Sequence, residues 1–441
     1  LLDSYFSATK ISWMLDHLPG ARTRAEAGEL AFGTIDSLVL RHLTGGLVHA
    51  TDVTNASRTL LMDLRSASWG DDLCEYFGIP PAILPAIVPS SGTIGQTFGL
   101  GYLPDGLPIA GIAGDQQASL FGNGCFQVGQ AKCTYGTGAF LLVNTGEDIV
   151  RSTTGLVTTP AATPPGLPQQ YALEGSVFIA GAAVQWFRDG LKAIGAAPEI
   201  NPMAEEADPE SELLFVPALT GLGAPHWEPE ARGTIFGITR GTTVPDLARA
   251  VIEGVAYQIA DLVDAMNADL TTSLASLRAD GGMARSDPFL RFQTNLMGLP
   301  IRRSPQTEAT ALGAAALAGL GVGLWPDLNA VAELREVARQ ADRAQFVLGP
   351  LAYGDGYLHP AAFALNLRLA HLGLDVAVVV VEGAYLGEVG LQHILLEDAR
   401  AGEPGEEALL LGGHEPAQFP VVEGRVAGEV YLGNHHLLAF L

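Results

Sequence analysis

Two short segments hold the residue types best suited to chemistry. Asp115 follows an apolar run at residues 108–113, and a Gly136-Thr137-Gly138 turn comes about twenty residues later. A carboxylate can accept the proton of a hydroxyl, and a Gly/Thr turn can wrap backbone N–H groups around a phosphate. Together they are the minimum equipment for moving a phosphoryl group onto an alcohol. Taken alone, the same residues also fit a helix cap and an ordinary turn.

The elements that must position these residues alternate between strands and helices. The segment 132–144 is predicted to form a β-hairpin around the Gly136-Thr137-Gly138 turn. Further strands are predicted at 107–113, 171–174, 213–217 and 276–280. Helices are predicted at 181–194, 244–267, 289–297 and 310–319, the last rich in Ala and Gly for close packing. Helical spacing also runs through 26–43. This alternation predicts layered α/β architecture.

Composition excludes several classes of partner. The chain has 441 residues and a net charge of −24, which argues against nucleic acid or an anionic membrane, because both require a basic face. Three cysteines without a C-x-x-C pair indicate reduced thiols, and hence a cytoplasmic protein. No apolar run reaches the roughly 18 residues that a membrane span needs. We therefore expect no membrane span, while homo-oligomerisation stays open.

Residues 341–441 differ in composition from the rest of the chain. They contain thirteen acidic and four basic residues and lack the glycine turns. The pattern predicts a helix at 361–372 and strands near 376–381, 408–411 and 428–432. Six histidines lie here at spacings that match no metal motif. We treat this stretch as an acidic α/β segment without an assigned function.

Longer patterns connect the first three quarters of the chain to a known family. Residues 5–17 resemble the first signature of the FGGY carbohydrate kinases, and residues 233–253 resemble the second. Within that family, the segments 51–59, 111–117 and 220–227 are most similar to glycerol kinases. The resemblance implies the two-domain α/β fold shared with actin, Hsp70 and hexokinase (ribonuclease H-like). It divides the chain into an N-terminal domain (1–125), a C-terminal domain (126–335) and the unassigned segment 341–441.

The resemblance also implies a reaction and its residues. It implies ATP-dependent phosphorylation of glycerol to sn-glycerol 3-phosphate, with Asp115 as general base close to Mg²⁺. Tyr5 and Gln116 resemble contacts to the glycerol hydroxyls, and Phe140 resembles an apolar wall against its carbons. The nucleotide contacts implied in the same way are Thr137, Gly181, Gln185, Gly282 and Ser286. The family usually has Asn where Ser286 stands.

Three departures limit the resemblance. Family members begin well before Tyr5, with a phosphate-binding hairpin, an Asp for Mg²⁺ and an Arg-Glu pair for glycerol. We therefore expect a truncated first domain with impaired catalysis. The segment before Pro108 lacks the Gly/Arg loop that binds a regulatory sugar bisphosphate in some relatives, and residues after about Leu334 do not match the family. The alternatives are a xylulose- or ribulose-type kinase and a non-catalytic fragment.

Overall fold

The computed structural model describes residues 6–304 and 309–332, together with the backbone of five short strands further on. The elements of the first part are α1 (Ser7–His17), α2 (Ala21–Glu26), β1 (Leu30–Gly33), α3 (Ile35–Leu43), β2 (Ala50–Asp52), α4 (Val53–Ala56), η1 (Ser57–Thr59), β3 (Met62–Asp63), β4 (Ser68–Trp69), α5 (Asp71–Phe77), η2 (Pro81–Ile83), β5 (Ala86–Val88), β6 (Ser91–Gln96), β7 (Pro108–Gly111) and α6 (Asp115–Gly122).

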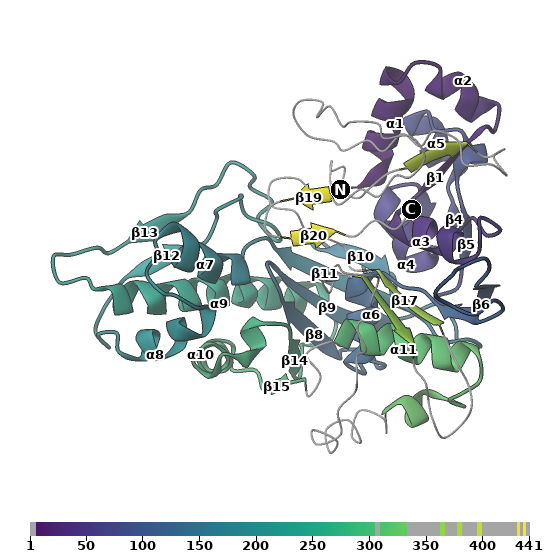
Figure 1. Ribbon diagram of the computed structural model, residues 1–441. Helices are drawn as coiled ribbons and strands as arrows, with labels where there is room; N and C mark the ends of the chain where they lie inside the picture. Colours follow the sequence, from purple (N-terminus) through teal and green to yellow (C-terminus); the bar gives the residue numbers. More distant parts are fainter. Residues whose placement is uncertain are drawn as a thin grey trace.

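The second part begins with the predicted hairpin. Its elements are β8 (Ala131–Tyr135), β9 (Ala139–Gly146), β10 (Val157–Pro160), β11 (Tyr171–Val177), α7 (Gly181–Gln185), η3 (Trp186–Gly190), η4 (Ala197–Glu199), α8 (Ile200–Glu205), β12 (Leu214–Val216), β13 (Thr234–Phe236), α9 (Val244–Asp269), β14 (Leu277–Asp280), η5 (Met283–Arg285), α10 (Asp287–Met297), β15 (Ile301–Arg303) and α11 (Ala309–Gly321). Figure 1 shows α1 to α5 at the upper right, β12, β13 and α8 at the left, the strands β8, β9 and β11 between them, and α6 with α11 below α3 and α4.

A mixed sheet organises the second part. Its strand order is β10-β11-β9-β8-β14-β15, with β8 and β9 antiparallel and β14 parallel to both β8 and β15. Successive side chains on a strand point to opposite faces. On β9, Leu141 and Val143 belong to the core cluster that includes α9, whereas Leu142 packs in the cluster that contains Leu120 of α6. Helices α9 and α6 therefore cover opposite faces of this sheet.

Helix α6 is held from its other side by α11 through very small residues. A Cβ atom added at Gly313 would lie 1.8 Å from the Ala118 carbonyl oxygen, and one at Gly122 would lie 1.9 Å from that of Ala309. Only glycine permits such an approach of two helix backbones. The prediction that the Ala- and Gly-rich helix packs closely is confirmed, and α6 is fixed between a sheet and a helix.

Most predicted elements are confirmed, and two of those within residues 6–332 need correction. The continuous helical pattern over 26–43 is wrong: Gly28, with φ +69°, follows the end of α2, and β1 turns Leu30 and Phe32 into the core before α3 starts. The helix predicted over 181–194 is shorter, because α7 passes into one turn of π-helix, η3, and ends at Gly190. The long helix is confirmed as α9, whose start is fixed by a capping box between Thr243 and Asp246.

Beyond residue 332 the structure gives the strands β16 (Ala362–Asn366), β17 (Ala377–Val381), β18 (Leu395–Asp398), β19 (Val430–Leu432) and β20 (His435–Leu437). The helix predicted over 361–372 is wrong at 362–366, where β16 pairs with β17 along its whole length. Strands predicted near 376–381 and 428–432 are confirmed by β17 and β19. The strand predicted at 408–411 lies outside the described residues.

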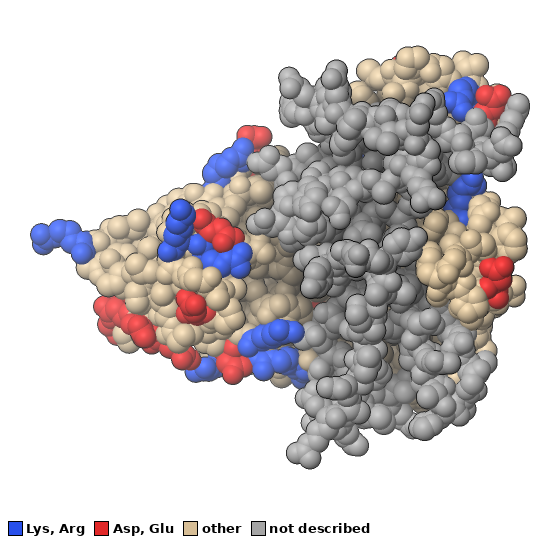
Figure 2. Space-filling view, viewed as in Figure 1, with Lys and Arg blue, Asp and Glu red and all other residues tan. Residues whose placement is uncertain are grey.

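Charged side chains of both signs lie on the described surface. On the face shown in Figure 2, acidic side chains follow the lower left edge of the end that holds α8, and basic side chains lie at its tip and on its upper side. All three cysteines are buried. Within the described ranges, no helix has the length and apolarity required to cross a membrane.

Candidate active site

Asp115 is the first residue of α6 and lies directly after the buried strand β7 and its connecting loop. Its Oδ1 accepts the Gln116 backbone N–H at 2.8 Å, and its Oδ2 accepts the Gln116 side-chain amide at 2.9 Å. Burial raises the pKa of the carboxyl, while the Gln116 hydrogen bonds and the charges of Lys132 and Arg58 oppose that rise. A base whose pKa is moved toward neutrality is better suited to accept a proton near pH 7.

The loop before Asp115 is held by a chain of buried hydrogen bonds. The Gly114 N–H donates to Thr54 Oγ1 at 2.8 Å, and Thr54 in turn donates to the Asp52 carboxylate. Asp52 caps α4 through the backbone N–H groups of Thr54 and Asn55, and it also accepts from Ser90 at 2.6 Å. The position of Asp115 is therefore set by β2 and α4 as well as by its own helix.

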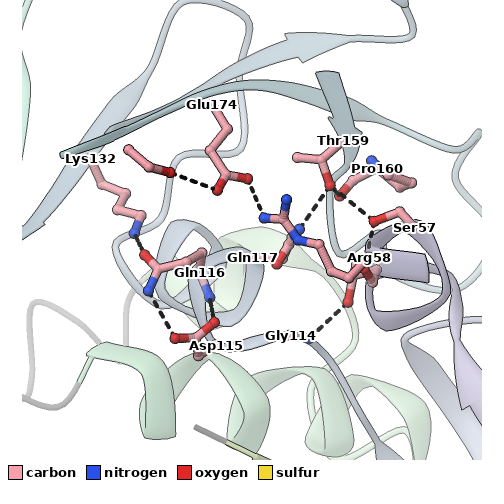
Figure 3. Close-up of polar contacts among 12 residues, drawn as sticks. Ser57, Arg58, Gly114, Asp115, Gln116, Gln117, Lys132, Thr159, Pro160 and Glu174 are labelled. Atoms are coloured by element: carbon pink, nitrogen blue, oxygen red, sulfur yellow. Dashed lines mark hydrogen bonds and ion pairs between the residues drawn. The ribbon is translucent and has the colours of Figure 1, made fainter. Parts of the chain in front are cut away.

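The face of the six-stranded sheet toward α6 is unusually polar. Cross-strand register places Lys132 and Glu174 beside Leu142, on the face that packs against α6, and Thr134 beside Phe140. The opposite face, which α9 covers, presents Cys133, Tyr135 and other apolar residues. Lys132 is fully buried and donates to the Gln116 side-chain oxygen and to Thr134 Oγ1 (Figure 3). The polar side chains of this face thus gather at the start of α6.

A buried ion pair joins the two parts of the chain next to Asp115. Arg58, from η1, forms a salt bridge with Glu174, from β11, and their side chains are only 12% and 5% exposed. Ser57 and Gln117 both contact Thr159 Oγ1, at 3.2 and 2.9 Å (Figure 3). The site is therefore a junction between the N-terminal elements and the sheet rather than a feature of either alone.

Three glycine turns meet at the end of the sheet. The Gly181 N–H donates to the Gly136 carbonyl at 2.9 Å, and the Ala180 and Ala182 N–H groups donate to the Thr137 carbonyl. A Cβ atom at Gly281 would lie 2.5 Å from the Tyr135 carbonyl oxygen, whereas one at Gly282 would meet nothing within 4 Å. Thr137, Gly181 and Gly282 are thus brought together, with open space above Gly282. Such close backbone turns suit the binding of phosphate groups.

The other predicted site residues differ from one another in burial and in hydrogen-bond partners. Phe140 is partly buried on the α6 face, next to Leu142 and Leu120. Gln185 is exposed at the end of α7. Ser286 caps α10: its hydroxyl accepts the Phe289 N–H and donates to Asn201 Oδ1 at 2.6 Å. Tyr5 lies outside the described residues.

Sequence reasoning missed the charged residues around the predicted base. Arg58, Lys132 and Glu174 are far apart in the chain, and a single charged residue on a strand is typical of a solvent-facing position. The sequence did hold one signal: the chain has only three lysines, and one of them lies in the strand directly before the Gly/Thr turn. The buried Asp280, at the end of β14, was missed for the same reason.

Comparison with protein-family models identifies both parts of this arrangement. The N-terminal domain of the FGGY family of carbohydrate kinases matches residues 1–122, and the C-terminal domain of the same family matches residues 131–322. Together the two matches cover well over half of the chain.

Individual relatives agree with the family models. The chain is 54% identical to a glycerol kinase of Myxococcus xanthus over 332 residues, which is 75% of this chain and 67% of that protein. It is also 54% identical to a glycerol kinase of Alkalilimnicola ehrlichii, covering 74% of this chain and 65% of the relative. The chain therefore spans about two thirds of the length of these relatives.

Solved structures show the same fold. The crystal structure of Plasmodium falciparum glycerol kinase with ADP superposes with a TM-score of 0.70 at 39% identity, covering 76% of this chain and 66% of that one. A ligand-bound xylulose kinase from Lactobacillus acidophilus gives a TM-score of 0.64 at 24% identity, over 74% and 66% of the two chains. The expected two-domain α/β fold is confirmed.

Proposed function

Because the chain belongs to the FGGY family of carbohydrate kinases, we propose that it catalyses the ATP-dependent phosphorylation of glycerol to sn-glycerol 3-phosphate. The observation that carries this proposal is the half-buried Asp115, fixed at the start of α6, together with the glycine turns at the end of the sheet that α6 covers. Identity of about half to glycerol kinases supports glycerol rather than another polyol. We place the division between the two domains at residues 125 and 126.

In the proposed reaction Asp115 accepts the proton of the attacking hydroxyl. The hydroxyl oxygen forms a bond to the γ-phosphorus of ATP, the bond from that phosphorus to the β,γ-bridging oxygen breaks, and ADP leaves. Tyr5 and Gln116 would hold the substrate hydroxyls, and Phe140 would line its carbon side. A triol needs several hydrogen bonds and one apolar face, and these residue types supply both. Positioning and charge neutralisation, rather than a covalent nucleophile, provide most of the catalysis.

The nucleotide would occupy the junction of the three glycine turns. Thr137 would contact the transferred phosphate through its hydroxyl and backbone N–H. Gly181 and Gln185 would contact the adenosine side, and Gly282 would allow close approach of the nucleotide because the space above it is open. Ser286 would act chiefly by anchoring α10, since its hydroxyl is already engaged with Phe289 and Asn201.

The side chains of this site would supply only part of the coordination of Mg²⁺. Among the described residues there is no cluster of three or more potential metal ligands. Mg²⁺ is commonly bound by one or two carboxylates together with substrate phosphates and water, and the Asp115 carboxylate can serve in that role. When bound, the ion would neutralise negative charge on the phosphates. We propose that the protein is cytoplasmic and needs no nucleic-acid or membrane partner.

The decisive experiment compares the unsubstituted protein with Asp115→Asn, both made as the full-length gene product. With glycerol and Mg·ATP at saturation, ADP release should fall by about 10²–10⁴-fold while the affinity for glycerol changes little, as expected for loss of a general base. Asp72→Asn, an exposed substitution on α5, serves as the matched control. No ADP release by the unsubstituted protein, or near-normal release by Asp115→Asn, would overturn the proposal. Faster turnover of xylulose than of glycerol would move the assignment to a pentulose kinase.

A further inference from the structure

Lys132 is a lysine in the interior of the protein. It is the second residue of β8, its relative exposure is 0%, and it points to the α6 face of the sheet. Burial of an ammonium group is costly unless polar partners replace water. Neither of the chain's other two lysines is fully buried. Polar groups around Lys132 must therefore stabilise its buried ammonium group in place of water.

Two neutral oxygens receive its hydrogen bonds. The Lys132 ammonium donates to Gln116 Oε1 and, at 2.9 Å, to Thr134 Oγ1. Within 6–304 and 309–332 it forms no direct ion pair with a carboxylate. Each neutral partner is instead connected to a carboxylate, either by one further hydrogen bond or by two.

The first route ends at Asp115. An ammonium group has only donors, so the part of the Gln116 amide that faces it must be the oxygen. The amide nitrogen must then point the other way, where it donates to Asp115 Oδ2 at 2.9 Å. A flipped amide would set its NH₂ group against the ammonium and its oxygen against the carboxylate, which is unfavourable at both ends.

The second route ends at Asp280. Thr134 already accepts from Lys132, so its hydroxyl is free to donate to Ser119 Oγ at 3.0 Å. Ser119 donates to Asp280 Oδ2 at 2.9 Å, and Asn123 donates to the same oxygen at 2.6 Å. Asp280 directly precedes the Gly281-Gly282 turn. Lys132 is therefore linked by hydrogen bonds to Asp280, next to the proposed nucleotide site, and through Gln116 to Asp115, at the proposed substrate site.

We propose that Lys132 is a positioning residue, whose donor-only ammonium fixes the orientation of the Gln116 amide and thereby holds the Asp115 carboxylate for reaction. This inference deepens the proposed function, on which its catalytic part rests. With the amide fixed, both carboxylate oxygens of Asp115 have a defined donor, and the second amide N–H of Gln116 is available for a substrate hydroxyl. Lys132 itself touches neither substrate in this scheme.

The orientation can be measured without turnover. In protein labelled with ¹⁵N at glutamine side chains, the Gln116 NH₂ signals are identified by their loss in Gln116→Met. Hydrogen exchange of these protons should become about 10–100-fold faster in Lys132→Met, which corresponds to losing a hydrogen bond to a charged group. Lys132→Arg keeps a donor-only cation and should retain most of the protection. Lys192→Met, at an exposed lysine, is the matched control and should change nothing.

A double-mutant cycle tests the catalytic part. Lys132→Met should lower kcat by about 10–100-fold with little change in the KM for glycerol, because the loss is in the alignment of the base. In a Gln116→Met background the same substitution should have almost no further effect, since the route to Asp115 is already removed. The double variant replaces both partners by apolar groups of similar shape, so it is also the variant expected to fold well.

The outcomes separate the inference from the function it deepens. Unchanged exchange of the Gln116 amide in Lys132→Met would overturn the inference whether or not the protein is a kinase. Equal losses of kcat in both backgrounds would also overturn it, because Lys132 would then act independently of Gln116. Absence of glycerol phosphorylation by the unsubstituted protein would overturn the proposed function alone, and the exchange measurement would still decide the role of Lys132.

Discussion

The buried carboxyl of Asp36 gives a prediction that needs neither substrate nor nucleotide. Asp36 lies in the first turn of α3, is 1% exposed, and accepts hydrogen bonds from Thr34 and, at 2.6 Å, from Thr51. Thr51 precedes Asp52, which holds the loop before Asp115 through Thr54. Asp36 therefore belongs to the framework under the proposed base, and its protonation state affects the stability of that framework.

The size of the effect follows from its pKa. Burial, with a smaller contribution from the Asp52 charge, raises the pKa of Asp36 from 3.8 to about 6, although Thr34 and Thr51 oppose the rise. The folded protein consequently binds more protons than the unfolded chain between these values. The stabilisation is complete below pH 3.8 and is lost as the pH rises through 6. The pKa difference corresponds to about 3 kcal/mol, of which about 2 kcal/mol is lost between pH 4.5 and pH 7.5.

Urea denaturation of Asp36→Asn and of the unsubstituted protein at these two pH values tests the reasoning. Asparagine cannot ionise, so the free energy of unfolding of the variant, relative to the unsubstituted protein, should improve by about 2 kcal/mol from pH 4.5 to pH 7.5. Asp264→Asn, at an exposed position on α9, should show no such pH-dependent difference. Parallel pH profiles for Asp36→Asn and the unsubstituted protein would refute the argument, because Asp36 would then titrate alike in both states.

Two further predictions concern how α6 and the site are held. Gly313→Ala should lower the free energy of unfolding by about 1–3 kcal/mol, because the added methyl would lie 1.8 Å from the Ala118 carbonyl oxygen; an unchanged thermal melting temperature would contradict this packing. Glu174→Gln should cost about 3–5 kcal/mol because it removes a buried charged partner of Arg58, whereas Glu205→Gln, in an exposed pair, should cost at most about 1 kcal/mol. Equal losses for the two glutamates in urea denaturation would disprove the distinction.

The parts of the fold that sequence predicts best are those in which local pattern and burial agree. The β8–β9 hairpin has strand-like segments on both sides of a Gly-Thr-Gly turn, and α9 combines helical periodicity with a capping box. The pattern over 26–43 failed because apolar spacing alone does not separate two short helices from one long helix. Gly28 carried the missing information, since its left-handed backbone separates α2 from β1.

The site likewise contains residues that the sequence locates and residues that it does not. Asp115, Thr137, Gly181 and Gly282 lie in motifs with a recognisable spacing, so the sequence locates them. The side chains that surround Asp115 depend instead on cross-strand register and on the stacking of α6 over the sheet. A difference of one residue in the register of β8 would turn Lys132 away from Gln116. No periodicity within β8 itself specifies that contact, which explains why the prediction missed it.

The two faces of the central sheet indicate why these buried charges are retained. The face against α9 is built from apolar residues, and it shows that this sheet can be covered without charged groups. The face against α6 carries Lys132 and Glu174, and Asp280 lies at its end, although each buried charge has a desolvation cost. A stability role alone would favour apolar residues on both faces. We infer that the α6 face keeps Lys132 because it orients Asp115 through Gln116, and keeps Glu174 because it pairs with the buried Arg58. The substitutions separate these two roles: Lys132→Met should change the reaction rate, and Glu174→Gln chiefly the stability.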